Sequence, residues 1–186
     1  MGKITRRHML APLLAIGAAA LIRPAAAAGR AEIDYDVHVA MQRLRALDAK
    51  TRALVGHAIA ILMFPNIVKG GFIVAGQYGE GALIEHDKTT GYYNIAAGSL
   101  GLQAGGQAFS YALLFFRRSA LDYLKKNDGW SIGTGPSIVV WDAGGAASVT
   151  NVTVTQDVVA VPFGLKGLMA GINLEGSKIS RISPGS

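Results

Sequence analysis

The chain has 186 residues, of which 51% are hydrophobic and 16% are charged, and it contains no cysteine. This size and composition suit one packed domain and exclude a disordered chain, and the lack of cysteine excludes disulfides, thiolate zinc sites, cysteine nucleophiles and a lipoprotein anchor. Residues 1–28 carry four basic residues and no acid, which leaves 14 basic and 12 acidic residues elsewhere, so we expect no nucleic-acid partner.

Residues 1–28 have the pattern of an export signal. A basic start is followed by an uncharged, mainly apolar stretch of 12 residues at 11–22 and by small residues at 25–28. The stretch is shorter than the roughly 20 residues that a membrane-spanning helix needs. Arg6 and Arg7 lie in a run that resembles a twin-arginine signal. We predict export to the periplasm and cleavage near residue 28; the alternative is an uncleaved membrane anchor.

Residues 32–64 have a helical pattern. Val37, Met41 and Leu44 recur at spacings of four and three, which gives one apolar stripe. A second apolar set continues to Leu62. The pattern predicts two helices, or one bent helix, with a break at 48–51 and an end at Pro65.

Glycine becomes frequent after Pro65, with 20 of the 24 glycines between residues 70 and 185. Segments rich in Val, Ile, Tyr and Phe alternate with turn residues, as in short strands. The candidates are 71–78, 82–86, 92–97, 101–116, 137–142, 147–155, 158–163 and 168–174. Residues 87–91 form a predicted hairpin loop. Residues near 119–126 form a predicted helix that begins with Ser119 as its cap and ends at Asn127.

Glycines at this density indicate a bent sheet rather than a flat one. The predicted fold class is α+β: N-terminal helices, then a strongly curved or barrel-like, mostly antiparallel, glycine-rich β-sheet with one inserted helix. Residues 29–186 are expected to form a single domain.

Four sequence blocks carry a resemblance to a known family. They are ILMFPNIVKGGF at 61–72, GQYGEG at 76–81, GSLGLQAGGQ at 98–107, and KGLMAG at 166–171 with LEGS at 174–177. Their order and spacing resemble the SYLF family, also called the Ysc84 family of lipid-binding domains. The resemblance extends from about residue 44 to residue 182.

The resemblance implies lipid binding, with an anionic phospholipid or membrane surface as the partner and with no cofactor. Eukaryotic members are associated with phosphoinositides, membranes and, in some cases, actin. The predicted export places this chain away from actin, and bacterial envelopes offer other anionic lipids than phosphoinositides. The alternative is an envelope structural or protein-interaction domain that does not depend on lipid.

Basic residues are the candidates for contact with lipid phosphates. Lys69 precedes a Gly pair, where the backbone can approach a ligand closely, and three other cations flank the final glycine-rich segments. Two arginines lie at the start of the helix predicted near 119–126. The alternative for each is a solvated surface charge. The candidate lipid-binding residues are Lys69, Lys166, Lys178, Arg181, Arg117 and Arg118.

The sequence offers no recognisable catalytic or metal-binding motif. Gly76, Gly79 and Gly81 lack the strand–loop–helix context and the Lys-Ser/Thr ending of a phosphate loop. The histidines lack a metal-ligand spacing, and no serine lies in a nucleophile elbow. We therefore expect a binding domain that is not an enzyme, with an enzyme of unrecognised type as the remaining alternative.

Overall fold

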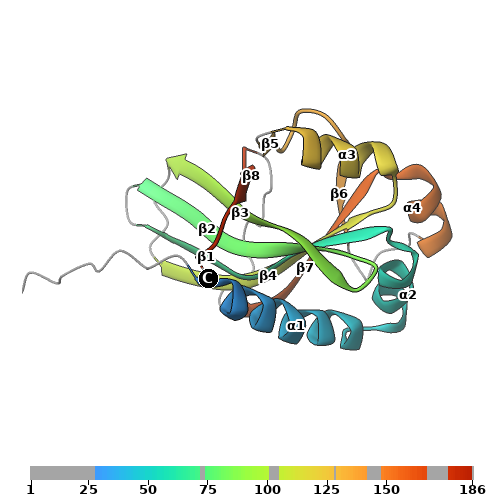
Figure 1. The fold of residues 1–186 in the computed structure, drawn as a ribbon, viewed down its shortest axis with the longest axis horizontal. Helices are drawn as coiled ribbons and strands as arrows, with labels where there is room; N and C mark the ends of the chain where they lie inside the picture. Colours follow the sequence, from blue (N-terminus) through green and yellow to red (C-terminus); the bar gives the residue numbers. More distant parts are fainter. Residues whose placement is uncertain are drawn as a thin grey trace, which may run out of the picture.

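The computed structural model describes residues 28–71, 74–100, 105–127, 129–141, 148–166 and 176–185 (Figure 1). The helices are α1 (Arg30–Ala46), α2 (Ala49–His57), α3 (Arg118–Lys126) and α4 (Val149–Thr155). The strands are β1 (Ala60–Gly71), β2 (Val74–Glu85), β3 (Lys88–Leu100), β4 (Gly105–Phe115), β5 (Trp130–Ser131), β6 (Ile138–Val140), β7 (Val158–Lys166) and β8 (Lys178–Ile182). The predicted leader, apart from residue 28, and the strand predicted at 168–174 lie outside the described residues.

The strands form one 8-stranded sheet in the order β5-β8-β3-β2-β1-β4-β7-β6. Neighbouring strands are antiparallel except for β6 and β7, which are parallel. The sheet curls strongly, with α1 and α2 along one side and α3 on the other (Figure 1). The α+β class, the N-terminal helices and the curved, mostly antiparallel sheet are therefore confirmed.

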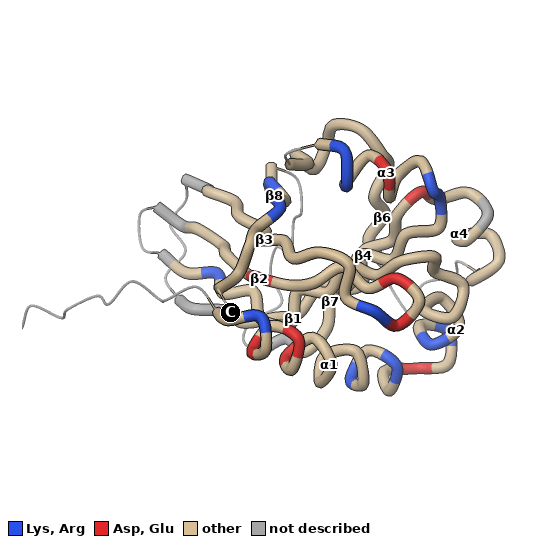
Figure 2. Tube along the Cα trace, viewed as in Figure 1, with Lys and Arg blue, Asp and Glu red and all other residues tan. Residues whose placement is uncertain are grey.

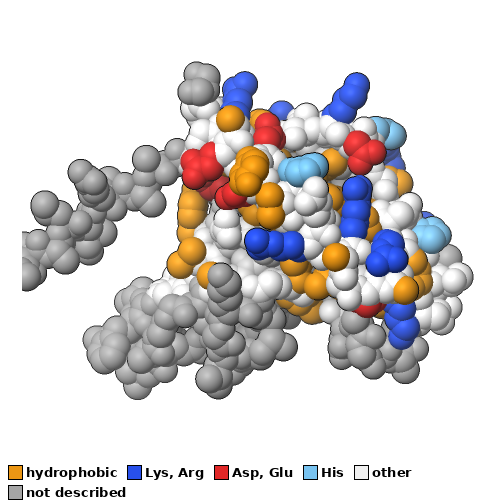
Figure 3. Space-filling model, turned by 90° about the horizontal axis from the view of Figure 1, so that it is seen from below, with side chains coloured by type: hydrophobic (Ala, Val, Ile, Leu, Met, Phe, Trp, Pro, Cys, Tyr) orange, Lys and Arg blue, Asp and Glu red, His pale blue; other side chains and the backbone are white. Residues whose placement is uncertain are grey.

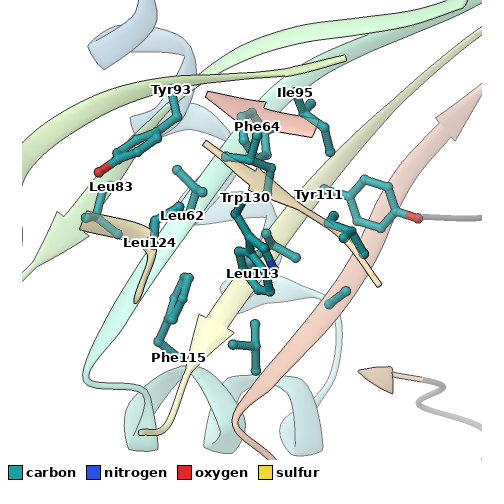
Figure 4. Packing of buried hydrophobic residues seen from close by; sticks show 14 of the residues in the cluster. Leu62, Phe64, Leu83, Tyr93, Ile95, Tyr111, Leu113, Phe115, Leu124 and Trp130 are labelled. Carbon is teal, nitrogen blue, oxygen red and sulfur yellow. The ribbon is translucent and has the colours of Figure 1, made fainter. Parts of the chain in front are cut away.

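Two hydrophobic clusters form because successive strand residues point to opposite faces of the sheet. The α3-side cluster contains Leu62, Phe64 and Leu113 of the sheet together with Leu124 and the fully buried Trp130 (Figure 4). The α1-side cluster is formed by the intervening strand residues and by α1, α2 and α4; it contains Ile33, Val37, Met41, Leu44, Leu54, Met63, Leu114, Trp141 and Val159 among others.

The break between the first two helices is confirmed. Helix α1 ends at Ala46, and Asp48 caps α2 by accepting a hydrogen bond of 2.8 Å from the Thr51 backbone N–H. The second helix ends at His57, however, and the prediction that helix continues to Phe64 is wrong. The apolar run at 61–64 lies in β1, where it is buried on both faces of the sheet, and a continuous apolar run does not distinguish such a strand from a buried helix.

Pro65 lies inside β1 instead of ending a helix. The register with β2 shifts between Met63 and Asn66, so the proline occupies a bulge, where its missing N–H breaks no regular pairing. The buried Ser110 hydroxyl donates a hydrogen bond of 2.6 Å to the Pro65 carbonyl and thereby satisfies that group.

Three further local predictions differ from the structure. The strand predicted at 147–155 is helix α4, which begins where Ser148 accepts a hydrogen bond from the Asn151 N–H. Helix α3 begins one residue before the expected cap, with Arg117 at the N-cap position, and Ser119 lies inside it. The loop predicted at 87–91 is a tighter turn at His86 and Asp87, which both have positive φ angles.

Candidate functional site

A cavity of about 370 Å³ lies where the start of α1 meets β3, β8 and the chain after β8. We call it the arginine cavity because Arg30 and Arg181 line it, and no acidic side chain is among its lining residues. The other lining residues are Thr89, Thr90, Gly91, Tyr92, Ile182, Ser183 and Pro184. The cavity is therefore a positively charged site built from segments that are distant in the sequence.

Contacts with the end of the chain hold Arg30 in place. Its backbone N–H donates to the Gly185 carbonyl at 3.1 Å, and its Nε donates to the Pro184 carbonyl at 3.3 Å. The guanidinium therefore keeps further N–H donors for a ligand. Arg181 comes from β8, where its backbone pairs with Tyr93, and its side chain is exposed and makes no ion pair with the described residues.

Three of the hydroxyl groups around the cavity, those of Thr89, Thr90 and Tyr92, donate hydrogen bonds to acids behind it. Thr89 Oγ1 and Tyr92 OH donate to the two carboxylate oxygens of Asp34, at 3.0 and 2.9 Å. Burial raises the pKa of Tyr92, and the bond to Asp34 raises it further, so the phenol stays neutral. Thr90 donates to Glu85 at 2.7 Å. The arginines are the charged groups in the lining that can bind an anion, and guanidinium matches phosphate or carboxylate by paired hydrogen bonds.

A row of apolar residues, two of them exposed and two half-buried, crosses the α1 side of the sheet. Val68, Tyr78, Ala96 and Ala108 are cross-strand neighbours on β1, β2, β3 and β4, and we call them the apolar strip. Val68 is 59% exposed and Tyr78 is 48% exposed, so the helices that cover the rest of this face do not cover the strip.

The arginine cavity and the apolar strip are connected along β3 and β8. Tyr92 lines the cavity and Ala96 belongs to the strip, four residues further along β3, which corresponds to about 13 Å on the same face of the sheet. Lys178 pairs with Ala96 and extends the row onto β8, four residues before Ile182 of the cavity. This face therefore offers partly exposed apolar surface with Lys178 beside it, whereas the side chain of Arg181, which pairs with Tyr93, starts from the other face of β8.

An acidic groove borders the strip on the side of α1. It has a volume of about 580 Å³ and is lined by Glu32, Asp36 and Glu80 together with Val68 and Tyr78. The remaining lining residues are Ala28, Ile33, Pro65, Asn66 and Gly79, and none of the lining residues is basic. Figure 3 shows acidic side chains gathered beside exposed hydrophobic ones on this face. An anionic headgroup is therefore excluded from the groove by its charge, in contrast to the arginine cavity.

The basic residues singled out in the sequence are spread over the molecule and do not form one cluster (Figure 2). Lys178 is exposed beside the strip and Arg181 lines the arginine cavity. Lys69 is half-buried on the opposite face, since it directly follows Val68 in the strand. The backbone of Lys166 pairs with Ala108, and its side chain lies outside the described part.

Arg117 and Arg118 lie at the start of α3, away from the cavity and the strip. Arg118 forms an ion pair with Glu85 at 3.8 Å, as Lys125 does at 2.5 Å.

Arg30 was absent from the candidates predicted from the sequence. No local pattern marks it, because its role depends on the Pro184 carbonyl at the other end of the chain.

No described helix combines the length and the apolar character that are required to cross a membrane. In the described ranges, no three His, Cys, Asp or Glu side chains are grouped so that they could hold a metal ion.

Comparison with known proteins gives one family match. Residues 96–183 match the model of the family described as Ysc84: Las17-binding protein actin regulator. The match begins within β3 and extends through β8. It includes three of the nine residues that line the arginine cavity, Arg181, Ile182 and Ser183, and two of the four residues of the apolar strip. No curated protein matches the chain.

Proposed function

We propose that the chain, whose residues 96–183 match the Ysc84 (SYLF) family model, is a non-catalytic module that binds anionic lipid at a membrane surface. The apolar strip contacts acyl chains, and the arginine cavity takes the anionic headgroup. The observation that supports this most directly is a cavity that is lined by Arg30 and Arg181 and by no acidic side chain, and whose Tyr92 lies on the same face of β3 as Ala96 of the apolar strip.

Neither element is sufficient by itself. A basic residue near an anionic membrane contributes about 1 kcal/mol, and burial of apolar surface contributes about 25 cal/mol per Å². Two arginines and the four side chains of the apolar strip therefore give stable attachment only when they act together. This predicts binding that depends on both lipid charge and apolar contact.

The charge dependence is tested by co-sedimentation of the full chain with vesicles of phosphatidylglycerol and phosphatidylcholine. Replacing Arg181 by Ala should weaken binding about fivefold, which corresponds to the loss of about 1 kcal/mol. Arg43→Ala is the matched control, since Arg43 is exposed on α1 and does not line the cavity. Equal losses for the two variants would show that only overall charge matters, and no binding by the unaltered chain would reject the proposal.

The apolar contact is tested by replacing Val68 with Ser. We expect weaker binding to the vesicles that the parent chain binds, with the preference for phosphatidylglycerol retained, since the substitution removes apolar area and no charge. Val139→Ser on β6 is the control, because Val139 is also exposed, at 41%. A loss for Val139→Ser as large as that for Val68→Ser would place the lipid contact elsewhere.

We further propose that the chain is exported through its twin-arginine-like leader and acts in the periplasm, peripheral to a membrane. Replacing Arg6 and Arg7 by Lys should then prevent accumulation of the full chain in the periplasm. Unchanged periplasmic accumulation of this variant would contradict the twin-arginine route.

A protein partner is the second candidate, favoured by the family description, which names a Las17-binding protein. In that case an envelope protein would occupy the exposed strip, and actin is not expected in the proposed compartment. Binding of an envelope protein that is unchanged after lipid extraction, together with no vesicle binding, would support this alternative.

A further inference from the structure

The acidic groove lies at the point where the described chain begins. The Ala28 backbone N–H donates a hydrogen bond of 3.0 Å to Glu80 Oε2, and the other oxygen of that carboxylate accepts one of 2.6 Å from Tyr78 OH. Ala28 is half-buried and packs against the α1-side cluster. The position of its nitrogen is therefore fixed by a contact with the sheet and by the packing of its side chain.

We infer that the leader is removed between Ala27 and Ala28 and that Glu80 binds the α-ammonium group which this cleavage creates. The inference rests on the export proposed above and is independent of lipid binding. The sequence at the predicted boundary fits, because Ala25 and Ala27 supply the small residues that leader peptidases require on the leader side of the bond.

The chemistry is a hydrolysis catalysed by the leader peptidase of the host. Water adds across the Ala27–Ala28 peptide bond, the oxygen goes to the Ala27 carbonyl carbon as a carboxylate, and the nitrogen of Ala28 becomes an ammonium at neutral pH. A peptide nitrogen donates one hydrogen bond, whereas an ammonium donates three and carries a positive charge. The contact with Glu80 would thereby become an ion pair.

The charges around this nitrogen favour an ammonium. Glu32 and Asp36 of α1 and Glu80 of β2 line the groove, and no basic residue is among its lining. The N-terminal end of α1 opposes the ammonium through the helix dipole, by an interaction that falls off within one turn. Glu80, at hydrogen-bond distance, therefore provides the compensating charge. Asp36 accepts from Asn66 at 3.0 Å, so Glu80 is the acid in direct contact with Ala28.

The experiment starts from the full chain with a C-terminal tag, expressed in an exporting bacterium and purified from the periplasm. Intact mass and N-terminal sequencing should give Ala28 as the first residue. A mature chain that begins at another residue would overturn this inference and leave export intact. A chain that keeps its leader would contradict the export proposal as well, while vesicle binding tests the lipid proposal separately.

The ion pair is tested in the purified chain by Glu80→Gln, with Glu32→Gln as the matched control in the same groove. We expect Glu80→Gln to lower Tm by about 2–4 °C at pH of about 7 and Glu32→Gln to lower it by less. An α-amine ordinarily has a pKa of about 7.7–8.0, so the Tm difference between the parent chain and Glu80→Gln should shrink at pH of about 9.5. An equal difference at the two pH values would show that Glu80 serves only its neutral partner Tyr78 and would overturn the ion pair.

Discussion

Gly81 on β2 leaves no space for a side chain. A Cβ atom at this position would lie 1.9 Å from the Met63 carbonyl oxygen and 2.9 Å from Phe64 Cδ1. Both neighbours belong to the stretch of β1 where the register shifts around Pro65, so the backbones of the two strands approach each other there. We expect Gly81→Ala to lower the free energy of unfolding by about 2–4 kcal/mol, because backbone atoms must move. Urea unfolding measures this loss.

Gly98 on β3 provides the control, since a Cβ there would meet nothing within 4 Å and its φ angle is not positive. Gly98→Ala should be neutral or stabilising by up to about 1 kcal/mol, through the unfolded state. Equal effects of the two substitutions would contradict the steric argument. Sequence alone placed both glycines just outside the predicted strands and could not separate them, because the close approach at Gly81 depends on the register with β1.

Arg30 and Lys69 show that prediction of the candidate site from sequence is limited in the same way, because the fold decides where each side chain lies. Lys69 was selected for the adjacent glycines, which do allow a close approach of the backbone. The alternation of side chains along β1, however, puts it on the opposite face from Val68 and Tyr78. Arg30 was missed because its contacts are with the last residues of the chain. Of the cations proposed from sequence, Arg181 lines the cavity and Lys178 lies beside the strip.

The β2–β3 hairpin is tied to α3 by one carboxylate. Glu85 is 9% exposed and contacts Lys125, Arg118 and Thr90. Burial acts to raise the pKa of Glu85, but the hydrogen bonds from Lys125 and Thr90 and the charges of Lys125 and Arg118 outweigh it, so the pKa is lowered. The folded state therefore favours the ionised form, and the stabilisation is present above the unfolded pKa and is lost as pH falls through the lowered folded value.

We expect Glu85→Gln to lower the free energy of unfolding by about 1–3 kcal/mol at neutral pH, the range for hydrogen bonds to charged groups. The difference from the parent chain should shrink below pH of about 4, where the parent carboxylate is protonated too. Asp122→Asn, on α3 beside Lys125 but outside this network, should show little effect at either pH. A difference that stays constant with pH would mean that Glu85 contributes through shape and not through charge.

Short apolar segments were the elements that sequence patterns misassigned. Residues 61–64 followed a helical pattern, yet they pair with β2 and β4 at the centre of the sheet. Residues 149–155 are rich in Val and Thr, as strands are, yet they form α4, where the Ser148 cap and the burial of Val152 outweigh strand propensity. Tertiary contacts decide whether such a segment forms a helix or a strand. The longer amphipathic pattern of α1 and the glycine-rich hairpins needed no such contacts to be predicted.

The whole molecule is organised as one sheet shared by two hydrophobic clusters. Glycine density predicted a curved antiparallel sheet, but the order of its strands was not predictable. β4 pairs with β1 instead of β3, and β7 lies beside β4, so both neighbours are set by contacts between distant segments. The consequence is that Leu62 and Met63, adjacent in the chain, belong to different clusters. Unfolding of either cluster would therefore remove packing contacts from the same strands.

The two tryptophans report on the two clusters separately. Trp130 belongs to the α3-side cluster and donates to the Thr134 carbonyl at 2.8 Å, whereas Trp141 belongs to the α1-side cluster and donates to Thr51 Oγ1 at 3.2 Å. In the single-tryptophan variants Trp141→Phe and Trp130→Phe, urea unfolding followed by fluorescence should coincide with unfolding followed by far-ultraviolet circular dichroism. Each substitution loses a hydrogen bond worth about 1 kcal/mol, so the comparison is made within each variant. Coincident midpoints follow if the shared sheet couples the clusters into one cooperative unit. A fluorescence midpoint that precedes the dichroism midpoint in one variant would show that its cluster unfolds independently of the sheet.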